Sequence, residues 1–262
     1  MVSEFTDGDP GRSIALLWGV TESGRRGPKP RHTVEDVVRA AISLADAEGL
    51  EALSMRRVAE TLQLSPMSLY TYVPSKAELM DLMVDRVAGE MGEPGPAGGD
   101  WRAQLTALCR DRWATAQRHP WIMQLARRRP PLGPNVLARV EAMLHTIDGL
   151  GLSEMEMDQL ISLVGDYVRG AVRAALDARE IEQQTGMTDE QWWSMNTPLL
   201  EGLVDPALYP TTVKIGEAYK SGRMVPPDHE RNFEFGLQRV LDGVEAFIAG
   251  RRDTASSARL EV

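Results

Sequence analysis

The amino-acid sequence predicts an all-α protein, with a small N-terminal domain containing a helix-turn-helix and a larger helical body. Three observations lead to this fold class. Apolar residues recur at helical spacing from residue 33 almost to the end, and no segment alternates as a strand does. Ser, Thr or Asp precedes several of these runs, as at helix starts. A Gly- and Pro-rich segment, "GEMGEPGPAGGD", separates the two parts.

Residues 1–30 are expected to form a disordered leader, because they mix Gly, Pro, Asp and Ser and the prolines and glycines disfavour a helix. The apolar run "SIALLWGV" follows acidic residues instead of basic ones, so a secretory signal is not expected. The leader ends in a basic arm, "GRRGPKPR", whose cations suit a phosphate backbone: Arg25, Arg26, Lys29 and Arg31.

The first two helices of the N-terminal domain (residues 31–90) have clear start signals. Thr33 and Asp36 form a capping-box pattern ahead of a helix that ends at Gly49. Ser54 is positioned to cap a second helix of about nine residues, whose first turn carries Arg56.

The third and fourth helices are bounded by serine and proline. Ser65 is positioned to cap the third helix with Pro66 at its first position, and Pro74 ends it. Ser75 starts the fourth helix, residues 75–90. The turn between the second and third helices has two or three residues, which is typical of a helix-turn-helix.

The third helix has an inward pair and an outward polar set. Leu69 and Val73 lie one turn apart and are expected to face the core, so the outward residues are Met67, Ser68, Thr71 and Tyr72. Hydroxyls and ammonium groups such as that of Lys76 are usual phosphate partners. For Tyr70 and Tyr72 a half-buried ring with its hydroxyl in water is an equal alternative.

The charge distribution supports a DNA-facing end. The net charge is −9, but residues 24–76 contain eight basic and six acidic residues, a balance of +2, so the remainder carries −11. Phosphates would be attracted to one end and repelled by the rest.

The body is expected to span residues 100–250, followed by a tail, 251–262. Its predicted helices are residues 100–118, 121–128, 134–149, 153–184, 188–200, 206–221 and 229–250. Apolar, aromatic or charged side chains on these helices could line a cavity, although plain core is an alternative for the apolar ones: Trp113, Met123, Arg128, Met143, Asp166, Tyr167, Arg169 and Met195.

The last helix carries an apolar stripe wide enough for a core or a subunit interface. The interface candidates are Phe233, Gly236, Leu237, Val240, Gly243, Val244 and Phe247. The two glycines cost a helix about 1 kcal/mol each relative to alanine, so close approach of another helix must offset them. A second subunit and ordinary packing within the chain both remain open.

Several other classes of protein lack support. There is no G-x-S-x-G, P-loop or dinucleotide motif, and the four histidines do not have metal-ligand spacing, so neither an enzyme nor a cofactor or metal is expected. Cys109 is the single cysteine, which excludes an intrachain disulfide and fits the cytoplasm. No run reaches the roughly 20 apolar residues of a membrane helix.

Residues 33–80, above all "LSMRRVAETLQLSPMSLYTYVPSKAELMDLM", resemble the DNA-binding domain of the TetR family of bacterial regulators. The segments "HPWIMQLARRRPPLGPNVL" and "FEFGLQRVLDGVEAF" resemble the C-terminal domain of its tetracycline-repressor branch. By motif match, the positions that touch DNA in the family are Arg56, Ser68, Tyr70, Thr71, Tyr72 and Lys76. The full expected DNA-binding set adds the basic arm, Ser54, Ser65 and Met67.

The resemblance implies a homodimer that binds a palindromic double-stranded operator and is released by a small-molecule effector, with repression the expected mode. A DNA-binding regulator without an effector, or an all-helical enzyme, are the alternatives. The branch's drug-binding histidine is missing from "MQLARRRP", and Ala174 and Ala175 stand near where an acidic ligand would fall, so a metal–tetracycline effector is not expected.

Overall fold

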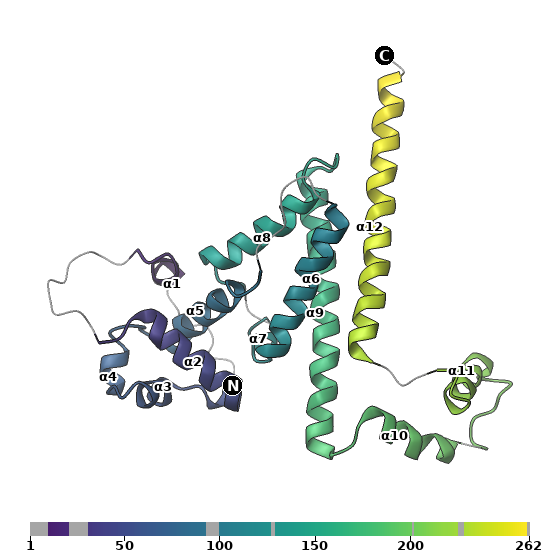
Figure 1. The fold of residues 1–262 in the computed structure, drawn as a ribbon, viewed down its shortest axis with the longest axis horizontal. Helices are drawn as coiled ribbons and strands as arrows, with labels where there is room; N and C mark the ends of the chain where they lie inside the picture. Colours follow the sequence, from purple (N-terminus) through teal and green to yellow (C-terminus); the bar gives the residue numbers. More distant parts are fainter. Residues whose placement is uncertain are drawn as a thin grey trace. The chain divides into compact units, whose positions relative to one another are not determined.

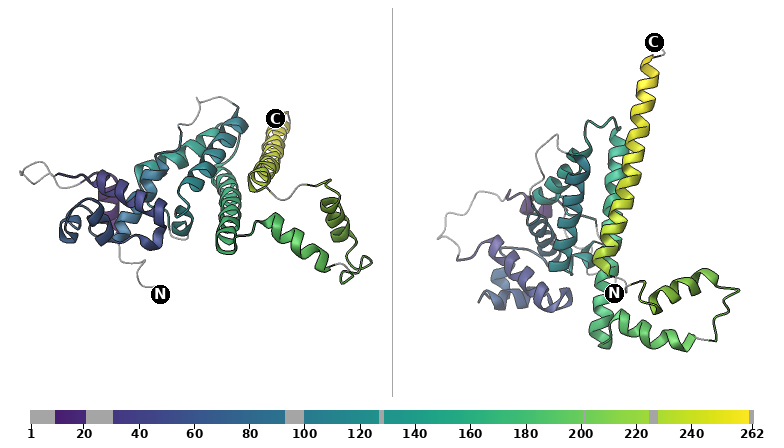
Figure 2. Two further views of the ribbon diagram at one scale, coloured as in Figure 1. Left: turned by 60° about the horizontal axis from the view of Figure 1, so that its bottom comes forward. Right: turned by 45° about the vertical axis from the view of Figure 1, so that its right-hand side comes forward.

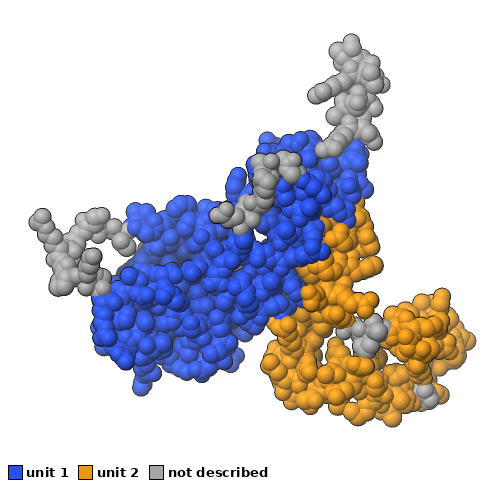
Figure 3. Space-filling model, in the orientation of Figure 1, with its two compact units in different colours: residues 1–165, 244–262 blue, residues 166–243 orange. Residues whose placement is uncertain are grey.

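The computed structural model describes residues 10–20, 31–92, 100–126, 129–200, 202–224 and 228–260, with the backbone alone for Pro10 and 252–260. Within these ranges it contains helices and turns but no strand, which confirms the predicted all-α class (Figure 1). The chain forms two compact units: residues 1–165 with 244–262, and residues 166–243 (Figure 3). The domain boundaries expected from the sequence stay a prediction.

Four helices form the N-terminal part that we call the reading head (residues 31–90). A serine or threonine hydroxyl caps each of them by accepting a hydrogen bond from a backbone N–H of the first turn, as predicted from Thr33, Ser54, Ser65 and Ser75. At Thr33 the capping box is complete, and the donated hydrogen bonds lower the pKa of Asp36. The elements are α2 (Val34–Glu48), the 3₁₀ turn η1 (Leu50–Ala52), α3 (Met55–Thr61), α4 (Pro66–Leu69) and α5 (Lys76–Ala88).

One apolar cluster holds the reading head together. Leu69 and Val73 are fully buried in it, as the sequence predicted, and so are Leu79, Met83 and Val87 of α5. Trp121 and Leu125 belong to the same cluster, although in the sequence they follow the Gly- and Pro-rich segment and so lie in the predicted body. The head therefore shares its core with the beginning of the body.

Two short segments differ from the prediction. The third helix was expected to reach Pro74, but α4 ends at Leu69, and Tyr70–Tyr72 form turns that hydrogen-bond back to Pro66, Ser68 and Leu69. The expectation that residues 1–30 contain no helix is wrong for α1 (Pro10–Leu17).

Helix α1 forms because Pro10 occupies the first helical position, where a missing N–H costs nothing, and because its apolar residues find a core. Leu16 and Leu17 pack against the apolar cluster, and the buried Ser13 donates a 3.2 Å hydrogen bond to Asp81 of α5. Tertiary packing therefore stabilises a helix in a segment whose composition predicts disorder.

The body helices lie where the sequence predicted them, within a few residues at most ends. They are α6 (Trp101–Arg118), α7 (Ile122–Leu125), α8 (Pro134–Ile147), α9 (Glu154–Thr185), α10 (Asp189–Asn196), η2 (Thr197–Leu200), α11 (Pro210–Lys220) and α12 (His229–Leu260). Helix α12 continues ten residues past Gly250, because one glycine costs a helix only about 1 kcal/mol and good helix formers follow. In the described part of the chain no helix has the length and apolarity needed to cross a bilayer.

Cys109 is buried on α6. Burial raises the pKa of its thiol to about 12, so the thiolate that reacts or binds metal is not populated near neutral pH.

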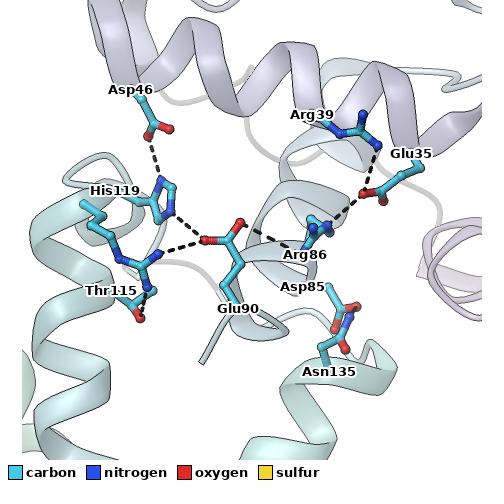
Figure 4. Close-up of polar contacts among 10 residues, drawn as sticks. Glu35, Arg39, Asp46, Asp85, Arg86, Glu90, Thr115, His119 and Asn135 are labelled. Carbon is cyan, nitrogen blue, oxygen red and sulfur yellow. Dashed lines mark hydrogen bonds and ion pairs between the residues drawn. The ribbon is translucent and has the colours of Figure 1, made fainter. Parts of the chain in front are cut away.

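A buried carboxylate of α5 caps α8, and the two helices lie in contact (Figure 2). Asp85 is 5% exposed and accepts hydrogen bonds from the backbone N–H of Val136 at 2.9 Å and from Nδ2 of Asn135 at 2.8 Å (Figure 4). A Cβ on Gly133 would lie 2.1 Å from Asp85 Oδ1, so only glycine leaves room for this carboxylate.

We expect Asp85→Ala to lower the free energy of unfolding by about 2–3 kcal/mol, because it leaves the buried donors at the start of α8 without an acceptor. Chemical denaturation with circular dichroism measures the change. Asp158→Ala is the control, since this aspartate is exposed on α9. Equal midpoints for the two variants would show that the cap does not stabilise the fold.

Candidate DNA-binding surface

The helix-turn-helix consists of α3, a four-residue connection (Leu62–Ser65) and α4, so the connection is slightly longer than the predicted two or three residues. In the turn, Gln63 takes the left-handed conformation with φ of 56°, which reverses the chain, and Leu64 N–H bonds back to Ala59 O at 2.8 Å. Ser65 caps α4 with Pro66 at its first position. Because Leu69 and Val73 are anchored in the core, the opposite side of this segment is turned to solvent.

The exposed side presents a compact set of the predicted residues. Met67 is 77% exposed and Tyr70 is 44% exposed, while Thr71 is also exposed. The Arg56 side chain is 80% exposed at the start of α3 and forms a 2.9 Å ion pair with Glu60. Lys76 lies half-buried at the first position of α5. We call these five residues, of which four are exposed and Lys76 is half-buried, the exposed reading set.

Several predicted hydroxyl groups are already engaged within the chain. The Ser54 and Ser65 hydroxyls accept hydrogen bonds from the N–H of Arg57 and Ser68 as helix caps. Ser65 Oγ lies 2.8 Å from Ser68 Oγ, and the Thr71 hydroxyl donates to Ser68 O at 2.6 Å. The Ser54 hydroxyl positions the start of α3, and the other three position the backbone of α4 and the turn after it. This role of Ser68 and Thr71 was not predicted from the sequence.

The two tyrosines have different environments. Tyr70 is exposed, whereas Tyr72 is half-buried and packs against the apolar cluster of the reading head. The structure therefore distinguishes two tyrosines for which the sequence allowed equal alternatives. The Tyr72 ring packs on the core, and the Tyr70 ring is turned to solvent.

An ion pair braces α3 against the end of α2. Arg57 donates to both carboxylate oxygens of Glu48, at 2.5 and 2.9 Å. This contact lowers the pKa of Glu48 and raises that of Arg57. Arg57 and Glu48 are nine residues apart and belong to different helices, so no sequence pattern predicts the pair.

Of the predicted basic arm, the structure describes Arg31, which is exposed. Arg25, Arg26 and Lys29 lie outside the described residues.

The predicted ligand-binding residues are not gathered in one compact unit. Trp113, Met123 and Met143 belong to the first unit, where Met123 is buried and the other two are half-buried. Asp166, Tyr167, Arg169 and Met195 belong to the second, and Arg128 lies outside the described residues. Asp166 and Arg169 are exposed and form an ion pair with each other, so each charge is balanced without a bound ligand.

The predicted dimer residues on α12 divide into buried and open positions. Phe233, Leu237 and Val244 are at most 2% exposed within the chain. They therefore offer no surface to a second subunit, and their assignment to an interface needs correction. Val240 is half-buried, and Phe247 is 42% exposed.

The two α12 glycines also have different explanations. A Cβ on Gly236 would lie 2.2 Å from the Tyr167 hydroxyl, whose ring stacks on Phe233 and which donates a 2.8 Å hydrogen bond to Phe233 O. Packing within the chain accounts for this glycine. At Gly243 no described atom outside its own helix lies within 4 Å of a Cβ, so the protomer itself gives no reason for glycine there.

The segment from α10 to α11 exposes many large apolar side chains. No residue of α10, η2 or α11 is buried. Trp192 and Trp193 are 48% and 52% exposed and pack edge to face with ring centroids 5.0 Å apart. Exposed apolar groups on this scale are typical of a surface that another molecule covers. This exposure was not predicted from the sequence, in which Met195 is a pocket candidate and the other residues only fit helical segments.

Comparison with known proteins agrees with these observations. Residues 37–83 match the model for bacterial regulatory proteins of the tetR family, and residues 93–248 match the model for the tetracyclin repressor-like C-terminal domain. The HTH-type transcriptional repressor DrrR1 of Streptomyces coeruleorubidus is 44% identical over 246 residues, which cover 94% of this chain and 89% of that protein.

Solved structures with a similar fold include ActR of Streptomyces coelicolor. Its ligand-free form aligns with a TM-score of 0.69 and 27% identity, covering 87% of this chain and all of that one. Its complex with actinorhodin aligns with a TM-score of 0.68 and 28% identity, covering 84% of this chain and 99% of that one. The chain therefore belongs to the TetR family of bacterial transcriptional regulators, and it is not an enzyme.

Proposed function

We propose that the protein is a repressor that binds a palindromic operator as a homodimer and releases it when a small molecule binds the body. The exposed reading set carries the DNA-binding part of the proposal. It combines two cations, two hydroxyls and an apolar side chain on a helix-turn-helix whose other side is locked into the core. Cations and hydroxyls suit phosphates, and Met67 suits a thymine methyl group.

The homodimer is supported by surfaces that one chain leaves open. Gly243 and Phe247 on α12 and the exposed Trp192 and Trp193 of α10 would be covered by a second copy. Two α4 helices could then enter successive major grooves about 34–36 Å apart. A protein that acts on operators works beside the genome, in the cytoplasm.

Effector control is supported by the relatives. ActR has been solved with actinorhodin and with (S)-DNPA, and it shares 27–28% identity with this chain. We infer that the body of this chain, residues 100–250, also holds a small molecule. A coupling of roughly 1–3 kcal/mol between the two sites would change operator affinity 5- to 150-fold.

Selection of bound duplexes from a random pool tests the DNA-binding proposal. We expect a palindrome whose half-sites are one helical turn apart. Recovery of no enriched sequence at low ionic strength would remove the operator from the proposal. A mobility-shift assay with the recovered duplex, using actinorhodin and (S)-DNPA as first probes within a wider metabolite set, then separates an effector-gated regulator from one without an effector.

We expect Tyr70→Ala to weaken binding of the selected duplex on the order of tenfold, because an exposed ring and hydroxyl are lost from the reading set. Fluorescence anisotropy measures this affinity. The free energy of unfolding should not change. Tyr72→Ala is the matched variant, and its main effect should be lower stability, since its ring packs on the core. A reversed pattern would show that Tyr72 is the DNA-contacting tyrosine.

We expect Gly243→Leu to weaken the dimer by at least about tenfold without destabilising the protomer, because leucine favours the helix but would occupy the space of a partner. Sedimentation equilibrium measures the dissociation. Gly236→Ala gives the contrast: it should lower the free energy of unfolding, because its Cβ meets Tyr167. An unchanged dimer in Gly243→Leu would place the interface elsewhere.

A further inference from the structure

A buried histidine connects the body to two separate elements of the reading head. His119 caps the end of α6 and is 7% exposed. Its Nδ1 lies 2.8 Å from Asp46 Oδ1 on α2, and its Nε2 lies 3.0 Å from Glu90 Oε2, two residues after α5 ends. Figure 4 shows the ring between the two carboxylates, which approach it from opposite sides. We call this arrangement the histidine clasp.

The chemistry of the clasp depends on the protonation of the ring. A neutral imidazole has one N–H donor and one lone pair, whereas an imidazolium has two donors. Carboxylates only accept hydrogen bonds. Both contacts are therefore hydrogen bonds when both ring nitrogens carry a proton. When one proton leaves, a ring lone pair faces a carboxylate oxygen, and one side of the clasp becomes repulsive.

The charged groups around the ring come from α2, α5 and α6. Asp46 also accepts a 2.7 Å hydrogen bond from Trp121 Nε1, and Glu90 accepts one from Arg118 at 3.3 Å. Arg86 of α5 lies 3.9 Å from Glu90 and 2.8 Å from Glu35 of α2, which Arg39 also approaches at 3.8 Å. Each carboxylate of the clasp thus accepts a hydrogen bond from a second donor besides the histidine. The group whose hydrogen bonding changes with protonation is therefore the imidazole ring.

The clasp also has a short connection to the DNA-binding surface. Asp46 and Glu48 are two residues apart at the end of α2, and Glu48 holds Arg57 of α3 through two hydrogen bonds. Arg57 adjoins Arg56 of the exposed reading set. A change at His119 therefore acts on the helix that supports α3, and through it on the surface that faces DNA.

We propose that His119 is a positioning residue whose protonation fixes the reading head to the body, so that operator binding is coupled to the uptake of a proton. This inference rests on the proposed function. The operator-binding arrangement contains the complete clasp, which requires the imidazolium. Raising the pH removes the second donor, loosens the head and weakens binding.

The test compares three proteins with the selected duplex by fluorescence anisotropy at constant ionic strength, from about pH 5.5 to 8.5, the range in which histidine side chains usually titrate. In the unmodified protein the affinity should fall about tenfold as the pH rises, which corresponds to one charge-assisted hydrogen bond. His119→Gln should lack this step, because its amide donates to one carboxylate only and does not titrate. Its pH profile also shows the background from the other histidines.

Glu90→Gln is the rescue variant. Its amide can donate to the unprotonated Nε2 while the Nδ1–H still donates to Asp46, so the clasp is complete with a neutral ring. At about pH 8.5 its affinity for the duplex should therefore be roughly tenfold higher than that of the unmodified protein, because the unmodified protein has lost one hydrogen bond of the clasp at this pH. Loss of a merely structural contact would weaken binding at all pH values and would not give this rescue.

A proton NMR titration of the full-length protein follows the ring directly, using the resonance that is missing in His119→Gln. A midpoint shared by this resonance and the affinity step supports the clasp. Identical pH profiles of the unmodified protein and His119→Gln would overturn the inference and leave the proposed function intact. If no duplex binds at any pH, the proposed function fails first and this inference with it.

Discussion

The burial of α5 is the constraint on which the first compact unit depends. Nine of its thirteen residues are buried, so this helix is a core element on nearly all sides. Two of the nine are the carboxylates Glu78 and Asp85, and buried carboxylates require donors. Glu78 contacts the capping Ser75, and Asp85 caps α8. The second pairing joins the helix that carries the reading head to a helix of the body.

This arrangement explains how a surface of few residues can be held in place. Helix α4 has four residues, too few to be stable alone. Its geometry comes from the Ser65 cap and from two anchors in the core, Leu69 and Val73, while Ser54 and the Arg57–Glu48 brace hold the preceding helix α3. The exposed side chains do not belong to the apolar core, which is the expected condition for groups that recognise another molecule.

Polar contacts concentrate where the head meets the body. Asp85 with α8, His119 with Asp46 and Glu90, and the Asp111–Arg139 pair with the backbone of Gly92 all lie near the end of α5. Hydrogen bonds of this kind are directional and weaken steeply with distance and angle, so a small displacement of one partner breaks them. A regulator that must pass a signal from one domain to another benefits from such contacts.

Residue spacing and local hydrogen bonding were enough to predict the helices after residue 33, apart from the early end of α4, together with the caps of the reading head and the inward pair Leu69 and Val73. The sequence also carried the family resemblance. Tertiary structure decided the rest. Helix α1 exists because Leu16 and Leu17 find a core, Tyr72 packs while Tyr70 does not, and Gly236 is explained by Tyr167. The contacts of Asp85 and His119 join residues dozens of positions apart, and such contacts follow no sequence period, so only the folded chain shows them.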